Sequence, residues 1–81
     1  MNMLIRTPGQ LGAHLRNVRK AKGWTQTELA GRSGLRQEYI SRIESGHESV
    51  TIVTLLKLMG ALGLDLSLSE RKSSANIGDV F

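Results

Sequence analysis

The sequence contains no cysteine, a single proline and only one each of Trp, Tyr and Phe. Without cysteine, disulfides, thiolate metal sites and thiol nucleophiles are excluded. The two histidines, His14 and His47, do not have the spacing of a metal-ligand pair, so no metal site is expected. No phosphate-binding loop, H-E-x-x-H motif or nucleophile–base arrangement is present. The sequence therefore predicts no catalytic residue, no cofactor and no enzyme activity.

Long hydrophobic runs are also absent. The longest apolar stretch, residues 58–64, has seven residues and includes two glycines, which is far too short to span a membrane. The first five residues have neither the basic start nor the apolar stretch of a signal peptide. We therefore expect a soluble, cytoplasmic protein that does not bind membranes.

The length of 81 residues allows one compact domain. A chain of this size buries only about 60% of the surface that its unfolded form exposes, and neither a disulfide nor a metal is predicted to stabilise it. Association of two copies is the remaining source of stability, so we expect a homodimer. Residues 1–69 are predicted to form the domain, and residues 70–81 a flexible polar tail.

Charge is unevenly distributed along the chain. Eleven Lys and Arg against seven Asp and Glu give a net charge of +4, and residues 1–42 hold eight of the basic residues but only two of the acidic ones. A basic half favours a surface that faces a polyanion such as nucleic acid. From charge alone, a solvated basic face without a ligand is an equal alternative.

Residues that start and stop helices recur along the chain. Thr7-Pro8-Gly9-Gln10 and Thr25-Gln26-Thr27-Glu28 are capping boxes, and Thr51 is a further N-cap. Trp24 and Leu29 are spaced as the hydrophobic staple of the second box. Between these starts and the glycines that end helices, apolar residues follow the helical period. The stop signals are Gly23, Gly34, Gly46 and Gly63.

The second and third predicted helices, which end near Ser33 and Ser45, are separated by only three residues, 34–36. Two short helices joined by such a tight turn cannot lie antiparallel, and they must cross steeply. That crossing is typical of a helix-turn-helix, so this pair is expected to form one.

The residues after the fourth helix change period. Residues 64–69 alternate apolar and polar side chains without exception, which predicts a half-buried strand with Leu64, Leu66 and Leu68 on one face. A single strand leaves both edges unpaired, and either residues 3–5 or the same strand of a second copy would pair with it. The expected fold is all-α, with four to five helices and a short C-terminal β-strand.

Residues 25–45, TQTELAGRSGLRQEYISRIES, resemble the lambda-repressor-like helix-turn-helix family, also called the Cro/cI or XRE family. The resemblance implies a nucleoid-associated protein that binds double-stranded DNA with its third helix in the major groove. The matching residues are Thr25, Gln26, Glu28, Leu29, Ala30, Gly34, Ile40, Ser41, Ile43, Glu44 and Gly46.

Polar residues at the start of the third helix are then the candidates for contacts with base edges. Gln37 can bond bidentately to adenine, Arg36 or Arg42 to guanine, and Ser41 to either kind of edge. Gln26 matches the family glutamine that holds a phosphate at the start of the second helix. The DNA-binding candidates are Gln26, Arg36, Gln37, Glu38, Ser41 and Arg42.

Two residues of the third helix leave alternatives open. Glu38 either accepts a hydrogen bond from a cytosine amino group or stays clear of the groove, because an acid repels phosphates. Tyr39 either reaches a phosphate with its hydroxyl or packs against the protein. The resemblance also implies an ion pair between Arg19 and Glu44 that ties the first helix to the third.

Residues 7–12 and 62–68 are similar to HipB-type antitoxins of the XRE family, which extends the resemblance over about residues 7–72. That similarity implies a repressor that controls its own toxin–antitoxin operon by binding a palindromic operator as a homodimer. It also implies that the C-terminal β-strands of the two copies pair across the dimer. It also implies binding to a HipA-like serine/threonine kinase toxin, with Phe81 as a possible toxin contact or simply the end of the chain. A stand-alone regulator and a protein-binding module that has lost DNA binding are the alternatives.

Overall fold

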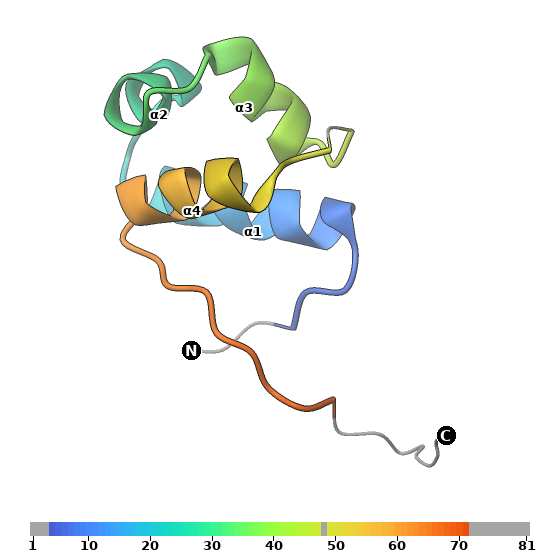
Figure 1. Cartoon of the computed structure of the whole chain (residues 1–81). Coiled ribbons are helices and arrows are strands. Elements are labelled where there is room, and N and C mark those ends of the chain that lie inside the picture. Colours follow the sequence, from blue (N-terminus) through green and yellow to red (C-terminus); the bar gives the residue numbers. More distant parts are fainter. Residues whose placement is uncertain (1–3, 48, 72–81) are drawn as a thin grey trace.

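The computed structural model describes residues 4–47 and 49–71, and this part of the chain folds into four helices without a strand (Figure 1). The all-α expectation is therefore confirmed. α3 packs against α1 and α2, and α2 also packs against α4. No helix in the described part is long and apolar enough to cross a membrane. The helices are α1 (Pro8–Ala21), α2 (Gln26–Ser33), α3 (Gln37–Glu44) and α4 (Ile52–Ala61).

Three of the four helices begin at a threonine whose hydroxyl accepts a hydrogen bond from the third backbone N–H of the helix. At Thr25 the predicted capping box is complete, because the Glu28 carboxylate also accepts from the Thr25 N–H at 2.9 Å. At Thr7 the box is only half formed. The Gln10 side chain accepts instead from the N–H of Arg6, one residue earlier than predicted.

The helices end at the predicted glycines. Gly23, Gly34, Gly46 and Gly63 have φ angles between 74° and 76°, the left-handed region that only glycine adopts without strain. This backbone conformation turns the chain sharply out of each helix. It allows α2 and α3 to follow each other after a three-residue turn.

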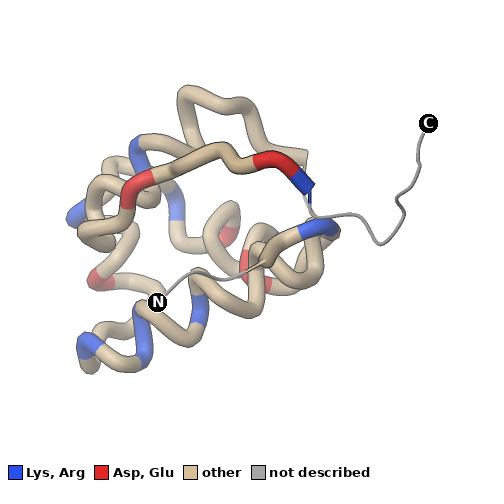
Figure 2. Tube along the Cα trace, turned by 90° about the horizontal axis from the view of Figure 1, so that it is seen from below, with Lys and Arg blue, Asp and Glu red and all other residues tan. Residues whose placement is uncertain are grey.

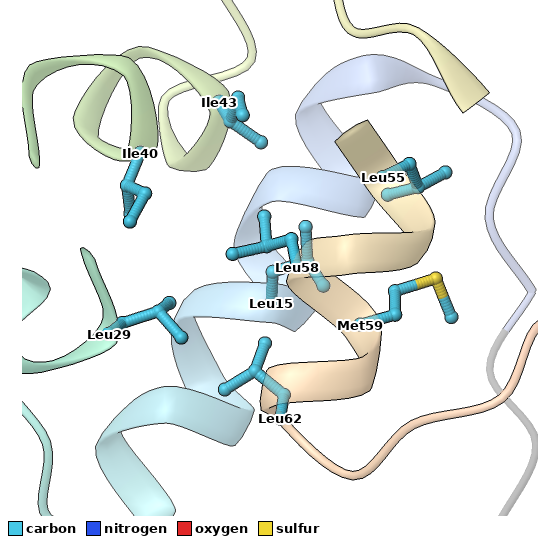
Figure 3. Close-up of a cluster of buried hydrophobic side chains, with 8 residues drawn as sticks. All are labelled: Leu15, Leu29, Ile40, Ile43, Leu55, Leu58, Met59 and Leu62. Carbon is cyan, nitrogen blue, oxygen red and sulfur yellow. The ribbon is translucent and has the colours of Figure 1, made fainter. Parts of the chain in front are cut away.

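A single apolar core lies among the four helices (Figure 3). Each helix contributes at least one side chain to it, and the most deeply buried ones are fully enclosed. Burying a Leu or Ile side chain contributes about 1.5–3 kcal/mol, so these residues dominate the stability of the domain. The core consists of Leu15, Leu29, Ile40, Ile43, Leu55, Leu58, Met59 and Leu62.

The predicted strand at residues 64–69 is not formed within the single chain. Leu64 is partly buried against the core, but Leu66 and Leu68 are 50% and 93% exposed. Pairing with residues 3–5 does not occur at Leu4 and Ile5, while Met3 lies outside the described residues. The reason is physical: a strand requires a second strand for its backbone hydrogen bonds, and the helices offer none.

Candidate nucleic-acid interface

The third helix is amphipathic, and its polar face is open to solvent. Ile40 and Ile43 are buried in the core, which fixes the orientation of the helix. The polar face, on the opposite side, consists of the residues at the start of α3 that were predicted to contact bases. Of these, Arg36, Glu38 and Arg42 are exposed, and Gln37 and Ser41 are half-buried.

A buried ion pair joins the first helix to the end of the third. Arg19 Nε donates to Glu44 Oε2 at 2.7 Å, and a second guanidinium nitrogen donates to Glu44 Oε1 at 3.0 Å. The two side chains are only 8% and 3% exposed. Hydrogen bonds to the Glu44 carboxylate raise the pKa of the Arg19 guanidinium, against the opposing effect of burial. Two hydrogen bonds therefore hold the guanidinium and the carboxylate against each other in the interior.

The Glu44 carboxylate also contacts one of the predicted DNA-binding residues, and that residue contacts a second one. Gln26 Nε2 donates to Glu44 Oε1 at 3.0 Å, and Gln37 Nε2 donates to Gln26 Oε1 at 2.6 Å. Two of the six predicted DNA-binding residues are thus brought into direct contact. Sequence analysis did not find this contact, although a signal existed: Gln26 and Gln37 are the first residues of two consecutive helices, and both have long polar side chains.

Trp24 anchors this network from the side of the first helix. Its carbonyl oxygen accepts from the third nitrogen of the Arg19 guanidinium at 2.7 Å. Its ring is partly buried against the core and contacts two cations, with Lys22 Nζ 5.4 Å and Arg32 Cζ 4.1 Å from the ring centre. The sequence predicted that Trp24 packs as a hydrophobic staple. It predicted neither the hydrogen bond to its carbonyl oxygen nor the contacts of its ring with cations.

The structure also places the two residues whose roles were left open. Tyr39 is partly buried against the core, and its hydroxyl donates to the Ser49 carbonyl oxygen at 3.4 Å, so it packs between α3 and the following loop. Glu38 is exposed in the first turn of α3, where a negative charge is favoured by the helix dipole.

Basic residues occur on all four helices of the described part of the chain. In Figure 2 the Lys and Arg positions are spread along the chain rather than gathered on one element. Such a distribution attracts a polyanion but does not select a sequence.

Residues 15–68, more than half of the chain, match the helix-turn-helix family. The chain belongs to this family, in its XRE branch. It is a DNA-binding transcriptional regulator. The four-helix, all-α fold expected for a lambda-repressor-like protein is thus the one observed.

Relatives of this regulator include antitoxins and other transcriptional regulators. Antitoxin HipB of Escherichia coli K12 is 35% identical over 71 residues, which span 88% of this chain and 81% of that protein. An uncharacterised HTH-type transcriptional regulator of Sinorhizobium fredii is 41% identical over 54 residues, spanning 67% and 70% of the two chains.

Two solved structures show the same similarity. HipB in a HipA–HipB–O2–O3 complex is 35% identical, with a TM-score of 0.79 over 88% of this chain and all of that chain. The restriction-modification controller protein C.AhdI of Aeromonas hydrophila is 40% identical, with a TM-score of 0.69 over 72% of this chain and 88% of that one.

Proposed function

We propose that this regulator is a HipB-like antitoxin that represses its own operon by binding a palindromic operator as a homodimer. The observation that carries the proposal is the Gln26–Gln37 pair, held by a buried ion pair at the open face of α3. Similarity to HipB over 88% of the chain supports the antitoxin assignment. Binding to the DNA upstream of its own gene, measured in a gel shift, tests it.

On DNA, α3 lies in the major groove and its polar face meets the bases. Gln37 contacts adenine, Ser41 a neighbouring base edge, and Arg36 and Arg42 contact guanine or phosphate. The Gln26 side chain is hydrogen-bonded to Gln37. The backbone N–H groups at the N-terminal end of α2 face a phosphate. Glu38, exposed in the same turn, either accepts from cytosine or keeps clear of the phosphates.

Replacing Gln37 with alanine is expected to weaken operator binding by about 1–3 kcal/mol and to relax preference at one base position of each half-site. The reason is that the variant loses both bonds to one base edge but keeps every phosphate contact. Fluorescence anisotropy with operator duplexes altered at single positions measures both effects. Asn17→Ala, on the exposed side of α1, is the control. If Gln37→Ala binds the operator with unchanged affinity and unchanged base preference, α3 does not recognise the bases.

The homodimer is supported by apolar side chains that the single chain leaves in water. They lie on the outer side of α4 and along residues 66–68, and each is 47% exposed or more. Burying them in a symmetric interface would add the stability that a small core lacks and would pair the predicted strands of the two copies. The side chains are Ile52, Val53, Leu56, Leu66 and Leu68.

Leu68→Asp tests this interface. Leu68 is 93% exposed in the single chain, so its replacement leaves the monomer fold intact. A charge buried without a partner between two copies is expected to weaken the dimer roughly 30-fold or more. Sedimentation velocity measures the change, with Ser69→Asp as the control because neighbouring strand residues face opposite sides. If both variants associate as the wild type does, the strand does not form the interface.

Toxin binding is the remaining part of the proposal. HipB occurs together with HipA in one of the similar structures, and we propose a HipA-like kinase as the partner here. Phe81, the proposed toxin contact, lies outside the described residues. A kinase encoded next to the gene and co-purifying with the protein would support the antitoxin role. A stand-alone regulator is the second candidate, because the 41% identical Sinorhizobium fredii protein is named only as a regulator.

A further inference from the structure

We propose that a cavity beside the start of α1 binds a small organic anion, namely a carboxylate with an apolar body. The cavity lies between the N-terminal segment, the first turn of α1, the loop that follows α3 and Arg71, and its volume is about 740 Å³. This volume is in the usual range of small-molecule sites. None of the predicted DNA-binding residues lines the cavity, so the inference goes beyond the proposed function and does not depend on it.

The rim of the cavity is basic. Arg6 lines it from the N-terminal segment, His47 from the loop after α3, and Arg71 from the end of the described chain. All three residues are exposed, and the described residues that line the cavity include no acidic one. Neither Arg6 nor Arg71 forms a side-chain hydrogen bond or ion pair with another described residue. Their guanidinium groups are therefore available to a carboxylate, to which a guanidinium can donate two parallel hydrogen bonds.

The inner wall of the cavity is apolar. It includes Leu11 and Val50, which are partly buried against the core, and Ile43, which is only 3% exposed. A small polar anion such as sulfate would leave this wall in contact with water, and a neutral ring would leave the guanidinium groups without a partner. The combination of a basic rim and an apolar wall therefore suits a ligand with a negative group at one end and a ring at the other.

Both sides of the cavity are held in place by hydrogen bonds of backbone N–H groups. On the α1 side, the Arg6 N–H donates to Gln10 Oε1 at 2.7 Å. On the loop side, the His47 N–H donates to a carbonyl oxygen in the last turn of α3 at 3.0 Å. The two sides meet where Gly46 packs on Gly9, so closely that a Cβ on Gly46 would lie 2.8 Å from Gly9 Cα. A ligand therefore meets walls that need little reordering, which favours binding.

The experiment is an NMR titration of the full chain with naphthalene-2-carboxylate, which joins a carboxylate to an apolar ring system. Saturable shift changes are expected at the backbone amides of Gly9, Gly46 and His47, with a Kd between about 10 μM and 1 mM for a ligand of this size. Naphthalene-2-carboxamide has the same shape without the charge and should bind about fivefold more weakly or worse. Acetate has the charge without the ring and should cause no saturable change in the same concentration range.

Two variants test the basic rim. Arg6→Gln and Arg71→Gln are each expected to raise the Kd for naphthalene-2-carboxylate about 3-fold to 10-fold, because each removes one charge-assisted contact at an exposed position. Both residues are exposed, so the fold is retained. Lys20→Gln is the matched control. It removes the same charge from an exposed residue of α1 that does not line the cavity, and it should leave the Kd unchanged.

The possible outcomes decide the proposal. The absence of saturable shifts, equal affinity for the carboxylate and the carboxamide, or shifts centred on Trp24 and its neighbouring cations would each refute the site. If the two arginine variants weaken operator binding and its salt dependence but leave the Kd for the probe unchanged, these cations contact DNA phosphates and the proposal is wrong. Gln37→Ala should bind the probe as the wild type does, so a failure of DNA recognition and a failure of the anion site are distinguishable.

Discussion

Gly12→Ala is expected to lower the free energy of unfolding by about 3 kcal/mol, the upper part of the range for overpacked interiors. Gly12 is buried where α1 crosses the end of α3. A Cβ at this position would overlap the carbonyl oxygen of Ile43 and lie 2.6 Å from that of Glu44. Both are backbone atoms that cannot rotate away as a flexible side chain would, so the two helices would have to separate.

Urea unfolding followed by circular dichroism measures this effect, and the chain offers a matched control. Gly31 lies within α2, and a Cβ there would meet no atom within 4 Å. Gly31→Ala is expected to raise stability by about 0.5–1 kcal/mol, because alanine is the better helix former. Equal tolerance of alanine at the two positions would mean that α1 and α3 do not cross as closely as the structure shows.

Arg19→Met is expected to destabilise the fold by about 3–5 kcal/mol, because it leaves the Glu44 carboxylate buried without its cation. The carboxylate is 3% exposed and would keep only the bond from Gln26. Adding Glu44→Leu should restore most of the loss, since an apolar pair of similar volume carries no desolvation penalty. The order of stability expected is therefore wild type and double variant above the single variant.

The same unfolding measurement tests that order, and its pH dependence adds a check. The raised pKa of Arg19 means that this group's contribution is fully present below the pKa of the unfolded state and is lost only as the pH rises through the still higher pKa of the folded state. Between pH 7 and 9, titration of Arg19 should therefore not change the stability difference between wild type and double variant. If the double variant is as unstable as Arg19→Met, the unpaired Glu44 carboxylate is not the cause of the lost stability.

Local signals in the sequence predicted much of the fold. Hydroxyl caps at Thr7, Thr25 and Thr51 and glycines after each helix depend on neighbouring residues only, and the structure shows each of them. The helical period of the apolar residues predicted the helices for the same reason, and several of these residues, such as Leu55 and Leu58, are buried in the core. Periodicity and capping depend on residues within one helix, so they can be recognised from the sequence alone.

Contacts between distant residues were harder to predict. The resemblance to a known family implied the Arg19–Glu44 pair, but composition and periodicity alone did not. The Gln26–Gln37 bond depends on how two helix starts meet, and the close approach at Gly12 depends on the crossing of two helices. Residues 64–69 have the alternation of a strand, but the described part of the chain offers no second strand to pair with them.

Hydroxyl-radical footprinting of the DNA upstream of the gene tests the central claim most directly, namely that two copies present their α3 helices to successive major grooves. The account predicts two protected half-sites on one face of the duplex, centred about 34 Å apart and related by twofold symmetry, with protection weakened in Gln37→Ala. A single protected half-site bound by one chain, or protection that does not depend on the DNA sequence, would contradict it.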